Sequence, residues 1–177
     1  MSIQIEQMTS CYDKHLNLKL AADDLGMKWQ TLYWNLKKAG HPVIGDKSKY
    51  GSKSDKVGFK AEQLFHEMIP FAKNLNEKKF QAKFDFLVGD MKVEVKASTL
   101  RPSNFRTKSK RWCFSLKRQV HFCDFFVCFG FNNDNDVEKI LLIPFEIANG
   151  RQSVSIGTGK SKWRDYVVTE KELKEFF

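Results

Sequence analysis

The sequence predicts an α/β fold of the α+β kind, in which a mixed β-sheet flanked by helices follows a small all-helical module. Residues 17–40 carry apolar side chains at the spacing of two short helices. Residues 80–97 alternate apolar and polar side chains around Gly89 and Asp90, which is the pattern of a β-hairpin. Residues 123–131 form an almost continuous apolar run, typical of a strand buried on both faces. Helices followed by strands favour a sheet with helices packed on it.

The size and charge of the chain limit the classes of protein it can be. Its 177 residues allow one full domain and a small appendage, at about 150 residues per domain. The formal net charge of +9 suggests a polyanionic partner, although a basic protein with an ordinary solvated surface has the same total. No window reaches the roughly 18 apolar residues of a membrane span, and the N-terminus lacks a signal-peptide pattern. We therefore expect a cytoplasmic protein with no membrane contact.

The cysteines form no CxxC pair and have no matching histidine spacing, so the sequence suggests neither a zinc site nor a disulfide framework. We expect reduced thiols at all four positions, which are Cys11, Cys113, Cys123 and Cys128.

The helical module is expected at residues 1–44. Gly26 separates its two amphipathic runs, and Gly40 followed by Pro42 is a stop signal for the second helix. Residues 45–55 are rich in Lys, Ser and Gly and are expected to form a basic linker or mobile loop.

The sheet domain is expected at residues 56–177, beginning with a helix that Ser54 or Asp55 can cap and that ends before Pro70. A basic loop at 100–110 and a strand end turning into a short helix at 112–122 are expected further on. The other strands are expected at residues 80–88, 91–97, 123–131, 138–143, 153–157 and 166–168.

Two acidic residues lie opposite each other in the expected hairpin. A two-residue turn pairs Val88 with Met91, and the same register pairs Asp85 with Glu94. Because side chains alternate faces along a strand, Lys96 shares the face of Glu94. The apolar residues of the hairpin are expected on the opposite, core-facing side: Phe84, Phe86, Val88, Met91, Val93 and Val95.

This arrangement predicts a metal site. Carboxylates about 5 Å apart repel each other unless a cation lies between them. Carboxylate oxygens and a backbone carbonyl, here that of Val95, are hard ligands that Mg²⁺ accepts, and Mn²⁺ is expected to substitute. With Asp85 and Glu94 on the metal and Lys96 beside its bound water, such a site can hydrolyse a phosphodiester. The alternative is an ordinary solvated strand face in which Lys96 simply pairs with Glu94.

The string FDFLVGDMKVEVKAS resembles the signature of PD-(D/E)XK nucleases, with Asp85 as the lone acid and residues 94–96 as the E-x-K. Phe84 stands where that family has proline, which contributes no ligand. The resemblance covers residues 54 to about 157 and implies a restriction-endonuclease-like α-β-β-β-α-β core with Mg²⁺-dependent DNA cleavage. It also implies that Glu62 in the preceding helix joins the metal site and that Gln119 helps to position water or phosphate. For Gln119 a solvated side chain is the alternative.

The string AADDLGMKWQTLYWNLKKAG resembles a helix-turn-helix, with small Ala22 where the helices cross and Gly26 in the turn. The resemblance implies that the second helix reads DNA. Residues expected on or near its outer side are Lys28, Gln30, Thr31, Asn35 and Lys38, and the rotation of the helix decides whether Tyr33, Trp34 and Lys37 join them in contacting DNA. The alternative is a plain helical hairpin that docks on the nuclease domain or mediates dimer contacts. Phosphate contacts are expected in the basic segment after the catalytic strand, at Arg101, Arg106, Lys108, Lys110 and Arg111.

The sequence therefore predicts a metal-dependent endonuclease of double-stranded DNA, of the restriction or homing type. A homo-oligomer, dimer or tetramer, is expected because one short active site cuts one strand. The alternatives are a non-catalytic DNA-binding regulator with a nuclease-like fold and a structure-selective junction resolvase.

Overall fold

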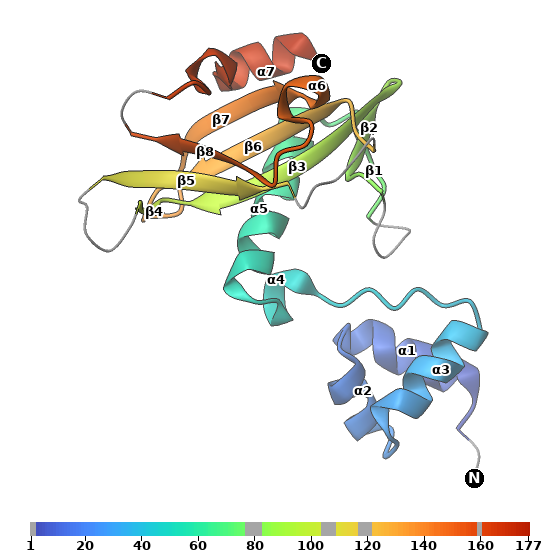
Figure 1. The fold of residues 1–177 in the computed structure, drawn as a ribbon. Coiled ribbons are helices and arrows are strands. Elements are labelled where there is room, and N and C mark those ends of the chain that lie inside the picture. Colours follow the sequence, from blue (N-terminus) through green and yellow to red (C-terminus); the bar gives the residue numbers. More distant parts are fainter. Residues whose placement is uncertain (1–2, 77–82, 104–108, 117–121, 159–160) are drawn as a thin grey trace.

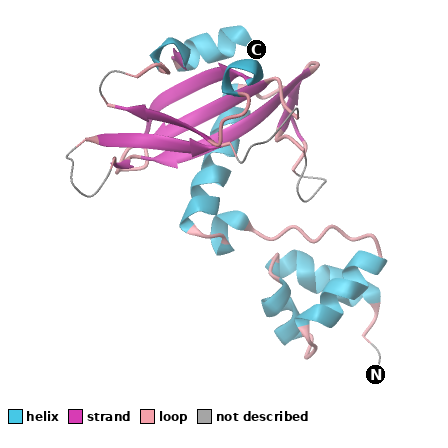
Figure 2. Cartoon of the chain, viewed as in Figure 1, coloured by secondary structure: helices cyan, strands magenta, loops and turns pink. Residues whose placement is uncertain are grey.

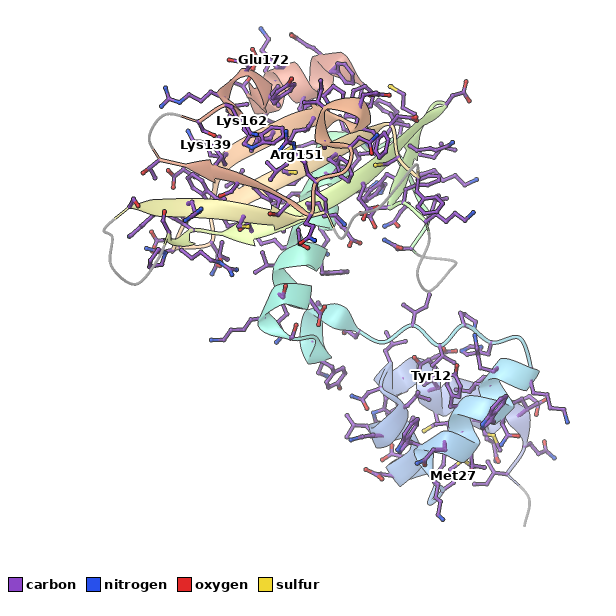
Figure 3. All side chains as sticks on the ribbon, viewed as in Figure 1. Tyr12, Met27, Lys139, Arg151, Lys162 and Glu172 are labelled. Atoms are coloured by element: carbon purple, nitrogen blue, oxygen red, sulfur yellow. The ribbon has the colours of Figure 1, made fainter. Side chains whose placement is uncertain are left out.

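Three helices form the N-terminal module of the protein (Figure 1). The structure, a computed structural model, describes residues 3–76, 83–103, 109–116, 122–158 and 161–177. The helices are α1 (Ile5–His15), α2 (Leu18–Asp24) and α3 (Trp29–Lys38). They share a hydrophobic cluster of their own, made of Met8, Tyr12, Ala21, Ala22, Leu32 and Leu36. Tyr12 and Met27 can be located within this module in Figure 3.

The two helices predicted in this module are confirmed. Asn17 caps α2, because its side-chain oxygen accepts the backbone N–H groups of Lys19 and Leu20. Gly26 has a φ of 63°, in the left-handed region that glycine adopts without a Cβ clash, and this allows the tight turn before α3. The sequence analysis did not predict α1, whose two buried side chains are separated by polar residues.

The predicted linker at residues 45–55 is wrong as a loop. It contains α4 (Lys47–Tyr50) and the first turn of α5 (Lys53–Met68). Ser52, rather than Ser54 or Asp55, is the cap of α5. Its hydroxyl accepts the Asp55 N–H, and the Asp55 carboxylate accepts the Ser52 N–H. This reciprocal cap starts a helix in a segment that has no apolar periodicity, and the helix ends before Pro70 as predicted.

The part of the chain that follows α5 contains a six-stranded mixed sheet (Figure 2). Only β3 and β6 run parallel among its paired strands. Its strands, in spatial order, are β1 (Lys73–Asn74), β2 (Phe86–Val88), β3 (Met91–Thr99), β6 (Phe125–Phe131), β7 (Val137–Pro144) and β9 (Val167–Val168).

A second, antiparallel sheet of three strands lies over one face of the first. Its members are β4 (Arg101–Pro102), β5 (Lys110–Ser115) and β8 (Ser153–Gly157). The remaining elements are α6 (Phe145–Ala148), a 3₁₀ turn (Arg164–Tyr166) and α7 (Glu170–Phe176). The predicted fold class, a mixed sheet flanked by helices after a helical module, is confirmed. No helix within the described ranges has the length and apolar character needed to cross a membrane.

Both faces of the central sheet are covered by hydrophobic clusters. One cluster joins α5 and α7 to the sheet and contains Phe65, Phe86, Val93 and Val95. The other lies beneath the second sheet. There the Trp112 ring sits 3.0 Å from the point where a Cβ on Gly130 would be, so a side chain at this position would require the ring to shift by a few tenths of an ångström.

The predicted strand at residues 80–88 is too long. Residues 83–85 form a bend rather than a strand, and 77–82 lie outside the described part of the chain. Because regular alternation fails in the bend, Phe84 packs against the cluster beneath the second sheet and not with Phe86 on the other face. Most of the short helix expected within 112–122 also lies outside the described residues, at 117–121.

Candidate metal and nucleic-acid site

The hairpin register predicted from its turn is confirmed. Val88 pairs with Met91, and Gly89 in the turn has a φ of 58°. The ladder ends at the pair of Phe86 with Val93. Beyond it the Asp85 N–H donates to the Val93 carbonyl at 3.1 Å, so Asp85 is not the direct ladder partner of Glu94 that the sequence predicts.

The Asp85 side chain instead bonds the side of β3 that faces β2, just beyond the last β2–β3 residue pair. Its Oδ2 accepts the Val95 N–H at 2.8 Å. The N–H and C=O of one strand residue point to the same side of the strand. The Val95 carbonyl therefore faces the edge at which the Asp85 carboxylate lies.

Asn76, which the sequence analysis did not select, connects two of the predicted acids. Its Nδ2 donates to Asp85 Oδ1 at 2.8 Å and lies 3.4 Å from Glu62 Oε2. Glu62 comes from α5 and Asp85 from the approach to β2, so one amide ties the helix to the hairpin. A search for acidic or basic motifs passes over such a residue, because an amide carries no charge.

Glu94 and Lys96 form a buried ion pair on β3. Only 7% of the Glu94 side chain and 15% of the Lys96 side chain are exposed. Their parallel partners on β6 are Phe126 and Cys128, both of which belong to the cluster beneath the second sheet. The alternative of an ordinary solvated strand face is therefore wrong in its solvation, since a hydrophobic layer surrounds the pair, although Lys96 does pair with Glu94 as that alternative expected.

Several charged groups near Cys123 shift the pKa of its thiol. The pKa of Cys123 is raised to about 12, chiefly by burial, with further upward contributions from the carboxylates of Glu94, Asp124 and Asp85 and an opposing one from Lys96. All four of these charged groups therefore act on a single buried sulfur.

The donor set at this edge suits Mg²⁺ in kind. Carboxylate and carbonyl oxygens are its preferred ligands, and a carboxylate with one hydrogen bond per oxygen still has lone pairs free. The spacing is looser than a closed metal cage. Among the described residues, Glu62, Asp85 and Glu94 do not bring one oxygen each within 4.8 Å of the others. Residues that can hold the ion are Asp85, Glu94 and Glu62, with the Val95 carbonyl.

The residues of α3 predicted to contact DNA are accessible. Leu32 and Leu36 are fully buried against the other helices, which turns the opposite side of α3 outward. Trp34 is 71% exposed. Those with exposed side chains are Lys28, Gln30, Thr31, Trp34, Lys37 and Lys38, while Tyr33 and Asn35 are half-buried.

A basic groove lies between the start of α5 and the end of β3. It is a cavity of about 560 Å³ whose walls include Lys53, Lys56, Arg101, Ser98 and Thr99. Arg101 was predicted to contact phosphate. Lys53 and Lys56 were not selected, although the density of lysine in residues 47–56 is a signal that could have found them.

The other predicted basic contacts are only partly placed. Lys110 is exposed on β5, and Arg111 donates through Nη2 to the Ser103 carbonyl at 2.7 Å. Three predicted site residues lie outside the described part of the chain: Arg106, Lys108 and Gln119.

Comparisons with known proteins assign no family. No protein-family model matches the chain, and no curated protein matches it in sequence. One solved structure that matches is a bacterial homing endonuclease, I-Ssp6803I, with a TM-score of 0.41 and 17% identity. The match covers 69% of this chain and 86% of that chain. A TM-score of this size establishes neither a shared fold nor a shared activity, so the function of this chain must be argued from its own residues.

Proposed function

We propose that the protein is a Mg²⁺-dependent endonuclease that hydrolyses phosphodiester bonds in double-stranded DNA. The observation that carries the proposal is the group of charges at the edge of β3, where Asp85 bonds Val95 and reaches Glu62 through Asn76. Beside it, Glu94 and Lys96 are withdrawn from water. Burying charged groups costs several kcal/mol per ion, and such groups concentrate at functional sites.

Each residue of this edge has a role in the proposal. Asp85 and Glu94, with the Val95 carbonyl and Glu62, hold the cation, and Asn76 keeps the two outer carboxylates in place. When bound, the metal ion supplies a water of lowered pKa and neutralises charge on the phosphate. The Lys96 ammonium donates one N–H to Glu94, and its two other N–H groups can hold the nucleophile or the phosphate oxygens.

DNA binding in the proposal uses two surfaces. The outer side of α3, with Lys28, Gln30 and Trp34 exposed, contacts the major groove and the phosphates of the DNA. The groove of Lys53, Lys56 and Arg101 binds the backbone without reading bases. Because one such active site cuts one strand, the proposal includes a homo-oligomer for a double-strand break, and light scattering of the purified protein measures its size.

The test is cleavage of supercoiled plasmid by the full chain, in Mg²⁺ and in EDTA. Wild type is expected to nick or linearise the plasmid only with Mg²⁺. Asp85→Asn, Glu94→Gln and Lys96→Met are expected to lower cleavage at least 100-fold, a loss of about 2.7 kcal/mol in transition-state stabilisation. DNA affinity, measured by fluorescence anisotropy, should change little.

Asp90→Asn is the matched control, because Asp90 is an exposed acid in the turn of the same hairpin. It should cleave as wild type does. Equal nicking by wild type and all the variants, or nicking that persists in EDTA, would reject the assignment.

A non-catalytic DNA-binding protein is the second candidate. It is favoured by the spacing of Glu62, Asp85 and Glu94, which do not form a tight cluster, and by the pairing of Glu94 with Lys96. In that case wild type binds DNA but does not cut it in Mg²⁺ or Mn²⁺.

Removal of residues 1–44 tests the helical module separately. If the protein is a nuclease, metal-dependent cutting should remain and the preference for particular sites should be lost.

A further inference from the structure

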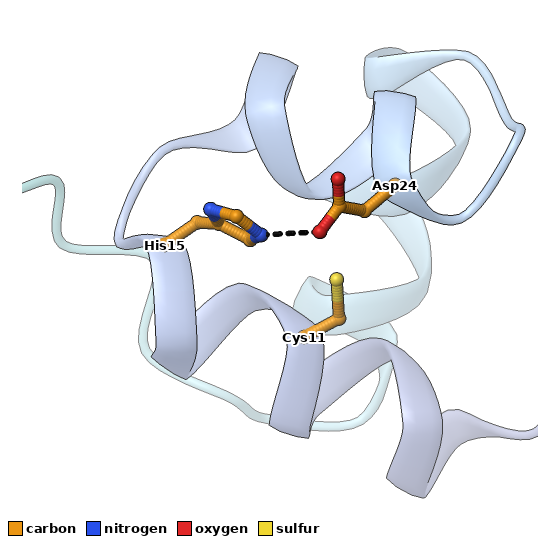
Figure 4. Close-up of side chains that lie close together, drawn as sticks. All are labelled: Cys11, His15 and Asp24. Carbon is orange, nitrogen blue, oxygen red and sulfur yellow. Dashed lines mark hydrogen bonds and ion pairs between the residues drawn. The ribbon is translucent and has the colours of Figure 1, made fainter.

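A second group of metal-binding side chains lies in the helical module. Cys11 and His15 are one turn apart on α1 and so share a face of that helix, and Asp24 is the last residue of α2 (Figure 4). One sulfur, one nitrogen and one oxygen from these residues all lie within 4.8 Å of one another. Within the described ranges this is the one such group of three found.

His15 and Asp24 already interact, and Cys11 lies beside them. His15 Nε2 lies 2.6 Å from Asp24 Oδ2, and the Cys11 thiol donates to the Ala21 carbonyl at 3.5 Å. Lys14 stands at the rim, 3.9 Å from the same Asp24 oxygen, with 73% of its side chain exposed. Burial raises the pKa of Cys11, and the Asp24 carboxylate raises it further, so the sulfur and the carboxylate lie within electrostatic reach of each other.

We propose that Cys11, His15 and Asp24 bind one zinc ion, with water in the fourth position. A thiolate, an imidazole and a carboxylate are the three kinds of side-chain ligand that Zn²⁺ takes, whereas Mg²⁺ avoids sulfur. A histidine–aspartate pair by itself needs no thiol beside it. The structure places a thiol there from the same helix face.

Zinc binding requires a small local change. With Zn–N and Zn–O bonds of about 2.0–2.1 Å in a tetrahedron, neighbouring ligand atoms lie about 3.3 Å apart. His15 Nε2 and Asp24 Oδ2 must therefore separate from 2.6 Å. The S–H bond of Cys11 breaks, its proton passes to solvent and a Zn–S bond forms, with no change of oxidation state. The proton that His15 Nε2 shares with Asp24 also leaves Nε2, to Nδ1 or to solvent, so that the Nε2 lone pair can bind the ion.

The ion would link α1 to the end of α2. Leu32 and Leu36 of α3 pack in one hydrophobic cluster with residues of both helices. Zinc would therefore fix the support of the helix that carries the proposed DNA contacts. The site is separate from the acidic edge of β3, and the inference stands whether or not the protein cuts DNA.

The test uses the full chain stripped with EDTA and titrated with Co²⁺, whose visible spectrum reports tetrahedral coordination and thiolate ligation. Wild type is expected to develop the thiolate-to-cobalt band at one ion per chain, and Zn²⁺ should abolish it. Cys11→Ser should remove the band and raise the Co²⁺ dissociation constant more than about 10-fold, the least expected for losing even an outer-shell partner. Asp24→Asn should weaken binding but keep the band.

Two controls make the result specific. Cys113→Ser removes an exposed free cysteine on β5 and should leave the spectrum unchanged. Asp90→Asn should also leave it unchanged, because Asp90 is an exposed acid in the turn between β2 and β3. The proposal fails if wild type shows no thiolate band, or if the band survives Cys11→Ser. Should Cys11→Ser lose its helical circular dichroism, the wild-type spectrum and its displacement by Zn²⁺ decide the question.

Discussion

Replacing Lys96 by methionine separates a merely structural ion pair from a metal-binding one. The change keeps the length of the side chain but leaves the Glu94 carboxylate, only 7% exposed, without its cation. Removing one partner of a buried pair costs about 3–5 kcal/mol. For a chain of this size that corresponds to a fall in melting temperature of roughly 6–20 °C in EDTA.

Mg²⁺ should restore part of this loss if the edge of β3 binds the ion. A ligand at about 100 times its dissociation constant stabilises the folded state by about 2.7 kcal/mol. We therefore expect melting of Lys96→Met, followed by differential scanning calorimetry, to shift upward with Mg²⁺ more than melting of the double variant Glu94→Gln/Lys96→Met.

Lys92→Met is the control for this experiment, because Lys92 is exposed on the same strand and two residues from Glu94. It should change stability by no more than about 0.5 kcal/mol. A destabilisation of Lys96→Met below about 1 kcal/mol would show that the ion pair does not hold a buried charge, and an identical Mg²⁺ response in the single and double variants would show that Glu94 does not bind the ion.

Three further predictions follow from the site and its surroundings. Asn76→Ala should raise the Mg²⁺ concentration for half-maximal cleavage by about 10-fold or more, because it releases the two carboxylates that it links, and an unchanged titration would contradict its role. With pKa values raised to about 12, Cys123 and Cys128 are thiolates in only about 1 molecule in 10⁴ at pH 8. A disulfide reagent should therefore label exposed Cys113 first, and Cys123 and Cys128 only after denaturation. Rapid labelling of Cys123 or Cys128 in the native protein would contradict their burial. Replacing Lys53 and Lys56 by glutamine should lower the slope of log DNA affinity against log salt by about 2, and a constant slope would remove the groove from the DNA contacts.

The hairpin and the helical turn were predictable because local rules determine them. A two-residue turn fixes the partner of Val88, and the spacing of Leu32 and Leu36 fixes the buried side of α3. Both predictions required only residues within a few positions of each other. The start of α5 was also local, yet the cap at Ser52 was missed because lysine, serine and glycine around it are typical of a loop.

The arrangement of the site was less accessible, because it depends on contacts between distant segments. The Asp85 side chain bonds the edge of β3 because the β2–β3 ladder ends at Phe86. Its other carboxylate oxygen accepts a hydrogen bond from the Asn76 amide. Glu94 is buried because β5 pairs with β8, about forty residues later in the chain, to cover that face. No spacing in the sequence encodes that pairing.

The zinc proposal illustrates the same difficulty. Cys11 and His15 have the spacing of one helical turn, but α1 was not predicted. Asp24 joins them only through the packing of α1 against α2. A search for cysteine pairs therefore finds no metal site in this sequence.

Diffraction from crystals soaked in Mn²⁺, recorded at the manganese absorption edge, would locate a bound ion at the edge of β3. We expect an anomalous peak within about 2.5 Å of carboxylate oxygens of both Asp85 and Glu94, together with the Val95 carbonyl. Lys96 should then have moved away from Glu94. A map in which that edge of β3 stays empty while Lys96 keeps its contact with Glu94 would rule out the metal site.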